Sequence, residues 1–202
     1  MLHGFQLHLI GKGTLTGKQF FTLEIAVNHD NGGLVIVQIP DNNRHGILAS
    51  QFAGPVPPVS KWKWLEPRHM VNYENRWGRN RNHDLQYCFF NGIGYNAWEN
   101  IWGIWNQFTD RDGETLRRIA RIYRQFPKLV VAMDWAPYQV CLQGGIFASV
   151  FPVDGLALRT FINRFEYEVC GEQIAIEHVE GTRYVDIWNG RELSPVIRDG
   201  QA

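Results

Sequence analysis

One strongly amphipathic segment, residues 112–126, constrains the fold of this chain more than any other part of its sequence. Apolar residues recur there at helical spacing, at Leu116, Ile119, Ala120, Tyr123 and Phe126. Pro127 follows directly, and proline ends a helix because it lacks a backbone N–H and its ring clashes with the preceding turn. We therefore predict one long helix here, with a change of structure at Pro127.

The sequence after the proline is typical of antiparallel strands. Short apolar runs alternate there with turn residues, and the predicted strands are 129–133, 145–151, 157–163, 173–176 and 184–188. Asn189 and Gly190 are the residue types of a tight hairpin turn. Short strands at regular spacing predict an antiparallel β-sandwich module over residues 128–202.

The sequence before the helix predicts strands of two kinds. Residues 20–27 and 34–39 are rich in β-branched and aromatic residues, and the Asn- and Gly-rich stretch between them predicts a hairpin. Residues 61–65 predict a short strand. Residues 85–93 are apolar on both faces, as in a buried parallel strand.

These patterns predict three segments. Residues 1–55 form a strand and hairpin segment, and residues 56–127 form a barrel-like α/β segment. The β-sandwich module of residues 128–202 follows them.

Charge and composition argue against several classes of function. The 202 residues include 20 basic and 20 acidic side chains, so the electrostatic footprint of a nucleic-acid-binding protein is missing. No apolar run reaches the roughly 18 residues that cross a membrane. The first residues lack the basic and apolar pattern of an export signal, and the compartment stays open.

The sequence predicts no metal and no cofactor. Its three cysteines, Cys88, Cys141 and Cys170, are widely spaced and form no CxxC pair. Buried free thiols are the preferred interpretation, and one disulfide with a spare thiol is the alternative. No phosphate-binding loop, dinucleotide fingerprint or nucleophile elbow occurs in the sequence.

Tryptophan is the unusual residue, with eight in the chain. Trp98, Trp102 and Trp105 share one face at helical spacing, and Trp62 and Trp64 share one face of the predicted strand. Indole rings stack on the C–H faces of sugars, which predicts a carbohydrate-binding surface. The same spacing is also typical of a core, and the two interpretations stay open.

Two carboxylates follow the predicted strands of the barrel-like segment. Glu66 comes after residues 61–65, and Glu99 comes after residues 85–93. In one parallel sheet the carboxyl ends of both strands would lie on the rim where α/β barrels have their active sites. Glycosidic cleavage needs such a pair, with one acid and one nucleophile or base.

The two carboxylates are predicted to have different roles. Arg68 lies next to Glu66 and opposes the raised pKa of an acid, so we predict Glu99 as the acid and Glu66 as base or nucleophile. The alternative is that Glu66 pairs with an arginine and Glu99 caps a helix. Side chains around the carboxylates are the predicted substrate-binding residues: Trp64, Arg68, His69, Trp98, Asn100 and Trp102.

Several longer stretches of the chain resemble a known group of proteins. They are residues 64–72, 84–87, 89–95 and 98–106, followed by 163–164, 184–190 and 193–195. Over roughly residues 57–200 the chain resembles large bacterial proteins with a glycoside-hydrolase-like (β/α) barrel and a β-sandwich. These are often fused to a sulfatase-modifying domain that resembles the formylglycine-generating enzyme. The resemblance assigns no catalytic residue.

The chain departs from that group in length. A complete barrel takes about 250 residues, and at most two predicted barrel strands precede the helix here. The predicted fold class is therefore α/β plus β, a C-terminal fragment of a (β/α) barrel followed by an antiparallel β-sandwich module. The predicted partners are a carbohydrate and the missing part of a larger multidomain chain.

Three functions fit these observations. The first is a glycoside-hydrolase-like protein that acts on or binds carbohydrate. The second is a non-catalytic carbohydrate-binding or interaction module, and the third is a structural remnant whose tryptophans all belong to the core. In an enzyme, Glu66 and Glu99 would lie about 5–10 Å apart in a cleft.

Overall fold

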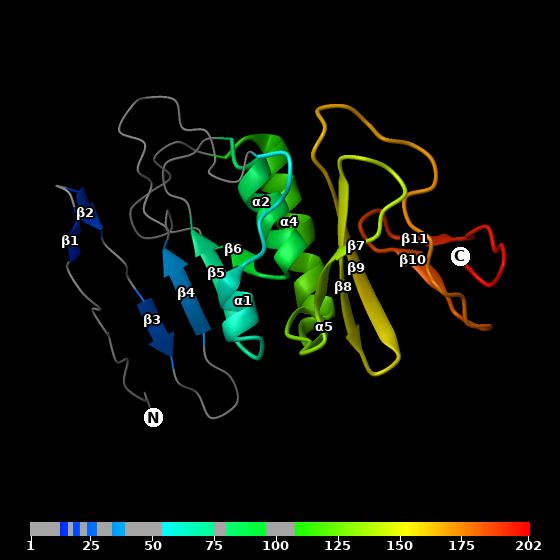
Figure 1. Ribbon diagram of the computed structural model, residues 1–202, viewed down its shortest axis with the longest axis horizontal. Helices are drawn as coiled ribbons and strands as arrows, with labels where there is room; N and C mark the ends of the chain where they lie inside the picture. The colour runs from blue at the N-terminus through cyan, green and yellow to red at the C-terminus, as the bar shows by residue number, and fades with distance from the viewer. Residues whose placement is uncertain are drawn as a thin grey trace.

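The chain is a mixed α/β protein, shown as a computed structural model in Figure 1. The structure describes residues 54–74, 80–95 and 108–202, together with the backbone of four strands nearer the N-terminus. Those strands are β1 (Gly13–Leu15), β2 (Lys18–Phe20), β3 (Glu24–Val27) and β4 (Leu34–Gln38). The later elements are α1 (Lys61–Leu65), β5 (Met70–Glu74), α2 (Asn82–Asn91), β6 (Gly94–Tyr95), α4 (Asp110–Gln125), α5 (Pro127–Val130), β7 (Ala136–Gln139), β8 (Ile146–Val153), β9 (Leu156–Asn163), β10 (Tyr184–Asp186) and β11 (Arg191–Leu193).

A mixed sheet with the strand order β3-β4-β5-β6 forms one layer. β3 and β4 are antiparallel, which confirms the predicted hairpin, with Ile25 opposite Ile36. β4, β5 and β6 are parallel, so the chain passes through α1 and then α2 to return to the same end of the sheet. Among the described residues this sheet stays open.

The predicted strand at residues 61–65 is wrong, because this segment is the helix α1. The hydroxyl of Ser60 caps it by accepting a hydrogen bond from the Lys63 backbone N–H at 3.3 Å. Lys63 is 1% exposed and its Nζ donates to the carbonyl of Val130. The strand of this region is β5, which follows α1 and was not predicted.

The predicted buried strand at residues 85–93 is also wrong, because the segment belongs to the helix α2. One side of α2 packs on the mixed sheet through Tyr87 and Cys88, and Leu85 on another side enters the main core. A helix buried on two sides loses the amphipathic pattern by which helices are recognised. Gly92 ends it with φ 63°, and a Cβ there would lie 2.5 Å from Phe151.

The long helix is confirmed as α4, which begins at Asp110. The hydroxyl of Thr109 caps it by accepting from the Asp112 N–H at 3.2 Å. The predicted strand at residues 129–133 is wrong, because Pro127 begins the short helix α5 and turns follow it. Proline is favoured at the first position of a helix, where its missing N–H has no partner to lose.

The part of the chain after α5 is built from antiparallel strands. β7, β8 and β9 form one sheet and β10 and β11 another, and no second long helix occurs in residues 131–202. The strands predicted at 145–151 and 157–163 are confirmed as β8 and β9, whereas 173–176 forms no strand. Asn189 and Gly190 lie in the turn between β10 and β11, as predicted, with φ 70° at Gly190.

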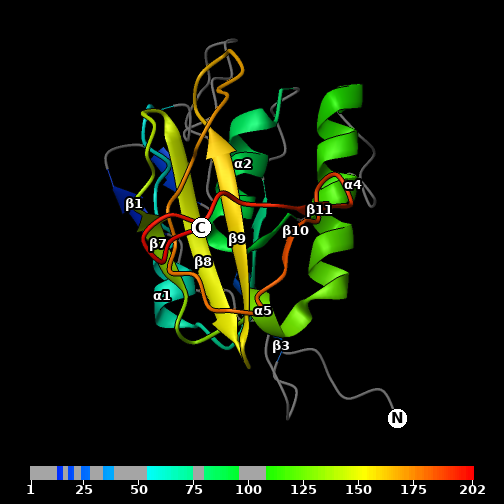
Figure 2. The same cartoon turned by 90° about the vertical axis from the view of Figure 1, so that its right-hand side faces the viewer.

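The helices lie between the two larger sheets (Figure 1). Figure 2 shows β8 and β9 side by side in front of α2, with α4 next to them. One apolar cluster joins Leu85 of α2, Ile122 of α4, Phe151 of β8 and Leu158 of β9. The division of the chain at residues 55 and 127 stays a prediction. No helix among the described residues is long and apolar enough to cross a membrane.

Candidate functional site at the carboxyl edge of the parallel strands

The predicted site residues fall into two groups. Glu99, Trp98, Asn100 and Trp102 lie outside the described residues. Trp64, Glu66, Arg68 and His69 lie together at the end of α1 and in the turn that leads into β5.

Glu66 is the C-cap residue of α1 and is half exposed. Its Oε2 lies 3.1 Å from Nδ1 of His69, so Glu66 pairs with a histidine rather than with the arginine of the alternative interpretation. Trp64 is 58% exposed, and its ring centroid lies 5.2 Å from that of Trp135. These side chains form a small aromatic and acidic surface.

Glu66 does not follow a strand and so does not lie on the predicted catalytic rim. Residues 61–65 are helical, so Glu66 precedes β5 and lies toward its amino end, instead of following a strand. In α/β proteins the active sites lie at the carboxyl ends of parallel strands. The catalytic role of Glu66 stays a prediction without that support.

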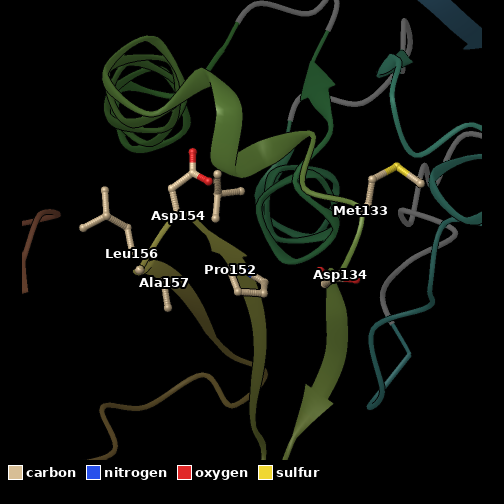
Figure 3. A pocket seen from close by; sticks show the side chains of 8 residues that line it. Met133, Asp134, Pro152, Asp154, Leu156 and Ala157 are labelled. Carbon is tan, nitrogen blue, oxygen red and sulfur yellow. The ribbon is translucent and has the colours of Figure 1, made fainter. Parts of the chain in front are cut away.

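A shallow hollow of about 470 Å³ opens beside the β8–β9 turn (Figure 3). It is lined by Met133, Asp134 and the turn residues 152–157. The two carboxylates, Asp134 and Asp154, come from different segments of its wall. No group of three metal-ligating side chains occurs anywhere in the described part of the chain.

The carboxyl edge of β5 and β6 carries a different set of polar residues. They come from the ends of the two strands and from the first turns of the helices that follow, and they are Tyr73, Arg81, Asp84, Tyr95 and Asp112. We call this set the carboxyl-edge cluster. Arg81, Asp84 and Asp112 are at most 1% exposed, which is rare for charged side chains unless they are paired.

Arg81 is the centre of the cluster. Its guanidinium lies 4.7 Å from the ring centroid of Phe108 and 5.8 Å from that of Tyr95, and it donates to the Tyr95 hydroxyl. The two rings meet edge to face, with centroids 6.0 Å apart. Tyr95 is the last described residue before position 96 and Phe108 the first after position 107, so Arg81 joins two segments that are separated in the sequence.

Two buried carboxylates connect the cluster to the helix ends. Oδ2 of Asp112 accepts a hydrogen bond from the backbone N–H of Arg81 at 2.7 Å, which ties the start of α4 to the start of α2. Asp84 lies in the first turn of α2, where the helix dipole favours an anion, and accepts from the Tyr73 hydroxyl at 3.4 Å. The ends of two strands and two helices are therefore joined through side chains.

The outer part of this edge is formed by α2 and the segment after β9. The side chain of Gln86 donates to the backbone carbonyl of Asn163 at 2.9 Å and accepts from Arg164 at 2.7 Å. Burial, together with the positive charges of Arg164 and Arg111, lowers the pKa of His83. A neutral imidazole is thus favoured at the rim, and its Nδ1 is buried without a hydrogen-bond partner in the described structure.

This arrangement is suited to supporting a binding site. The charged side chains of the cluster are too buried to form much of a ligand-contacting surface, but Arg81 fixes Tyr95 and Phe108, which are the described residues on either side of positions 96–107 in the sequence. That segment contains the predicted residues Trp98, Glu99, Asn100 and Trp102. Cys88 of α2 is unsuited to nucleophilic chemistry, since it is buried and burial raises the pKa of its thiol.

The prediction of buried free thiols holds only in part. All three thiols are free, but Cys141 is half buried and Cys170 is exposed.

The carboxyl-edge cluster was not predicted from the sequence, because β5 was not recognised as a strand. From Val71 to Glu74 its sequence alternates apolar and polar residues, which is a strand signal. With β5 in place, Tyr73 would have been recognised at a strand end. Comparisons of the chain with protein-family models, curated proteins and solved structures find no match.

Proposed function

We propose that this chain is a carbohydrate-binding protein of glycoside-hydrolase-like architecture, with its ligand at the carboxyl edge of β5 and β6. The observation that carries the proposal is the position of Arg81 between Tyr95 and Phe108. These rings flank residues 96–107, where Trp98 and Trp102 are spaced to offer indole faces to a sugar.

The order of the layers supports the architectural part of the proposal. β4, β5 and β6 are parallel and connected through helices, as in a (β/α) barrel, whereas β3 departs from that pattern by pairing antiparallel with β4. The antiparallel strands after α5 pack on the far side of those helices. A barrel fragment followed by a sandwich module would have this layout. In such a protein the missing part of the barrel is a natural partner.

Binding is favoured over hydrolysis by the position of Glu66. A glycosidase needs two carboxyl groups about 5–10 Å apart, and Glu66 lies on the amino-end side of β5, where it is paired with His69. Hydrolysis with Glu99 as acid and Glu66 as nucleophile or base is the second candidate. The reason to keep it is the half-exposed Glu66 beside the exposed indole of Trp64.

Isothermal titration calorimetry with a panel of cellohexaose, xylohexaose, mannohexaose and maltohexaose tests the proposal. We expect the wild type to bind at least one of them and Trp98→Ala to bind it more weakly. Hydrolysis of activated aryl glycosides by the wild type, Glu66→Gln and Glu99→Gln separates the two candidates. Absence of binding to every oligosaccharide would overturn the proposal, and loss of hydrolysis in both variants would favour the enzyme.

A further inference from the structure

The segment after β9 carries an exposed pair of stacked aromatic rings. The centroids of Phe165 and Tyr167 lie 4.8 Å apart, with an interplanar angle of 13°. Phe165 is 42% and Tyr167 is 64% exposed, so the pair lies outside the core. Rings that are exposed and still stacked on each other present a flat face to the solvent.

The pair is built into the surrounding backbone. A Cβ at Gly145 would lie 2.4 Å from the Phe165 ring, so only glycine allows the ring to lie this close to the chain. Asn163 accepts from the Phe165 N–H at 2.9 Å and donates from its amide to the Tyr167 carbonyl at 2.7 Å. These contacts fix the backbone on both sides of Glu166 and limit the freedom that a ligand would have to restrict.

The stacked pair lies at the same edge as the carboxyl-edge cluster. Arg164, the residue before Phe165, hydrogen-bonds Gln86 of α2 and the Gly54 carbonyl. Glu166, between the two aromatic residues, acts electrostatically on His83, which adjoins Asp84 of the cluster. The start of α2 therefore connects the cluster to the aromatic pair.

We infer that Phe165 and Tyr167 form an aromatic subsite for one sugar ring of an oligosaccharide bound along this edge. The inference rests on the proposed carbohydrate binding and adds the residues that hold the outer part of the ligand. The flat face of Tyr167 contacts the C–H face of the sugar, and its hydroxyl can donate to or accept from a sugar hydroxyl. Charges of both signs lie next to the rings along the chain, on Arg164, Glu166 and Glu168, and suit a neutral oligosaccharide.

The test compares five proteins by calorimetry with the four hexasaccharides: the wild type, Tyr167→Ala, Tyr167→Phe, Trp64→Ala and Leu193→Ala. Tyr167→Ala should bind about tenfold more weakly, as expected for loss of one aromatic contact, and Tyr167→Phe should keep most of the affinity. Leu193 is exposed on β11, so Leu193→Ala controls for the loss of an exposed apolar side chain. Circular dichroism confirms that each variant is folded.

Two results would overturn the inference. If the wild type binds and Tyr167→Ala binds equally well, the aromatic pair is no subsite, although the proposed function stands. If Trp64→Ala loses affinity in that case, the ligand lies on the amino-end side of β5. If no hexasaccharide binds the wild type, the proposed function and the subsite both fail.

Discussion

Replacing Lys63 with methionine should remove a pH dependence of stability that one buried amine creates. Lys63 is 1% exposed, and its Nζ donates to the carbonyl of Val130 at the end of α5. Burial lowers its pKa from 10.5 to about 8, because the charged ammonium loses its hydration. The folded state therefore binds fewer protons than the unfolded state between pH 8 and 10.5.

The sign and size of the effect follow from that difference. Where the unfolded state binds more protons, the free energy of unfolding rises with pH. At 1.36 kcal/mol for each pKa unit, the wild type should gain about 2.5 kcal/mol between pH 7 and pH 10 from this group alone. Lys63→Met loses the hydrogen bond to Val130, at a cost of about 1 kcal/mol, but it has no amine to titrate, so its free energy of unfolding should lack this rise with pH.

Urea denaturation of the wild type and Lys63→Met at pH 7, 8, 9 and 10 measures the difference. Subtracting the two curves removes the titration of tyrosines, including Tyr87, whose pKa is raised by burial to about 12. Lys61 is exposed in the same helix, so Lys61→Met controls for the loss of a positive charge. Parallel stability curves for the wild type and Lys63→Met would refute the reasoning.

Four further predictions concern single positions. Gly94→Ala should destabilise the protein by about 2 kcal/mol through overpacking, because a Cβ there would lie 1.8 Å from Asn72 Oδ1. Gly113→Ala, with open space around it in α4, should raise stability by about 0.5–1 kcal/mol, and thermal denaturation compares the two. The pKa of His83 is lowered below 6.5, so the wild type should lose stability relative to His83→Gln as the pH falls through 6.5 in urea titrations. A difference in stability between the two proteins that stays constant over this pH range would contradict the lowered pKa. Asn91→Leu should lower the free energy of unfolding by about 3 kcal/mol in the same assay. The Asn91 side chain accepts from the Ser60 N–H and donates to the carbonyls of Pro58 and Tyr87, at 2.8–3.1 Å. A smaller loss of stability than in the exposed control Asn80→Leu would contradict this prediction.

The elements that the sequence predicts well have one buried face. α4 has an apolar stripe and an N-cap threonine, and β8 and β9 pair as a regular hairpin. α2 was mistaken for a strand because it is buried against both the mixed sheet and the main core. α1 was mistaken for a strand because it buries a lysine, which no hydropathy pattern marks as a core residue.

The candidate site was predictable only in part, since its location depends on which segment is the strand. Reading residues 61–65 as a strand moved the expected rim to Glu66, whereas the strand β5 ends near Tyr73. Asp112 stands at the start of the predicted helix, but its bond to the Arg81 backbone joins residues distant in the sequence. Such contacts depend on helix packing, which local periodicity does not report.

Chemical-shift mapping by NMR tests the location of the site most directly. A uniformly labelled chain would be titrated with the hexasaccharide that binds most tightly in the calorimetric panel. We predict that the largest changes in backbone amide chemical shift occur at Arg81, Tyr95, Phe108 and Tyr167, on the carboxyl edge. Shifts concentrated at Trp64, Glu66 and His69, with the carboxyl edge unchanged, would contradict it.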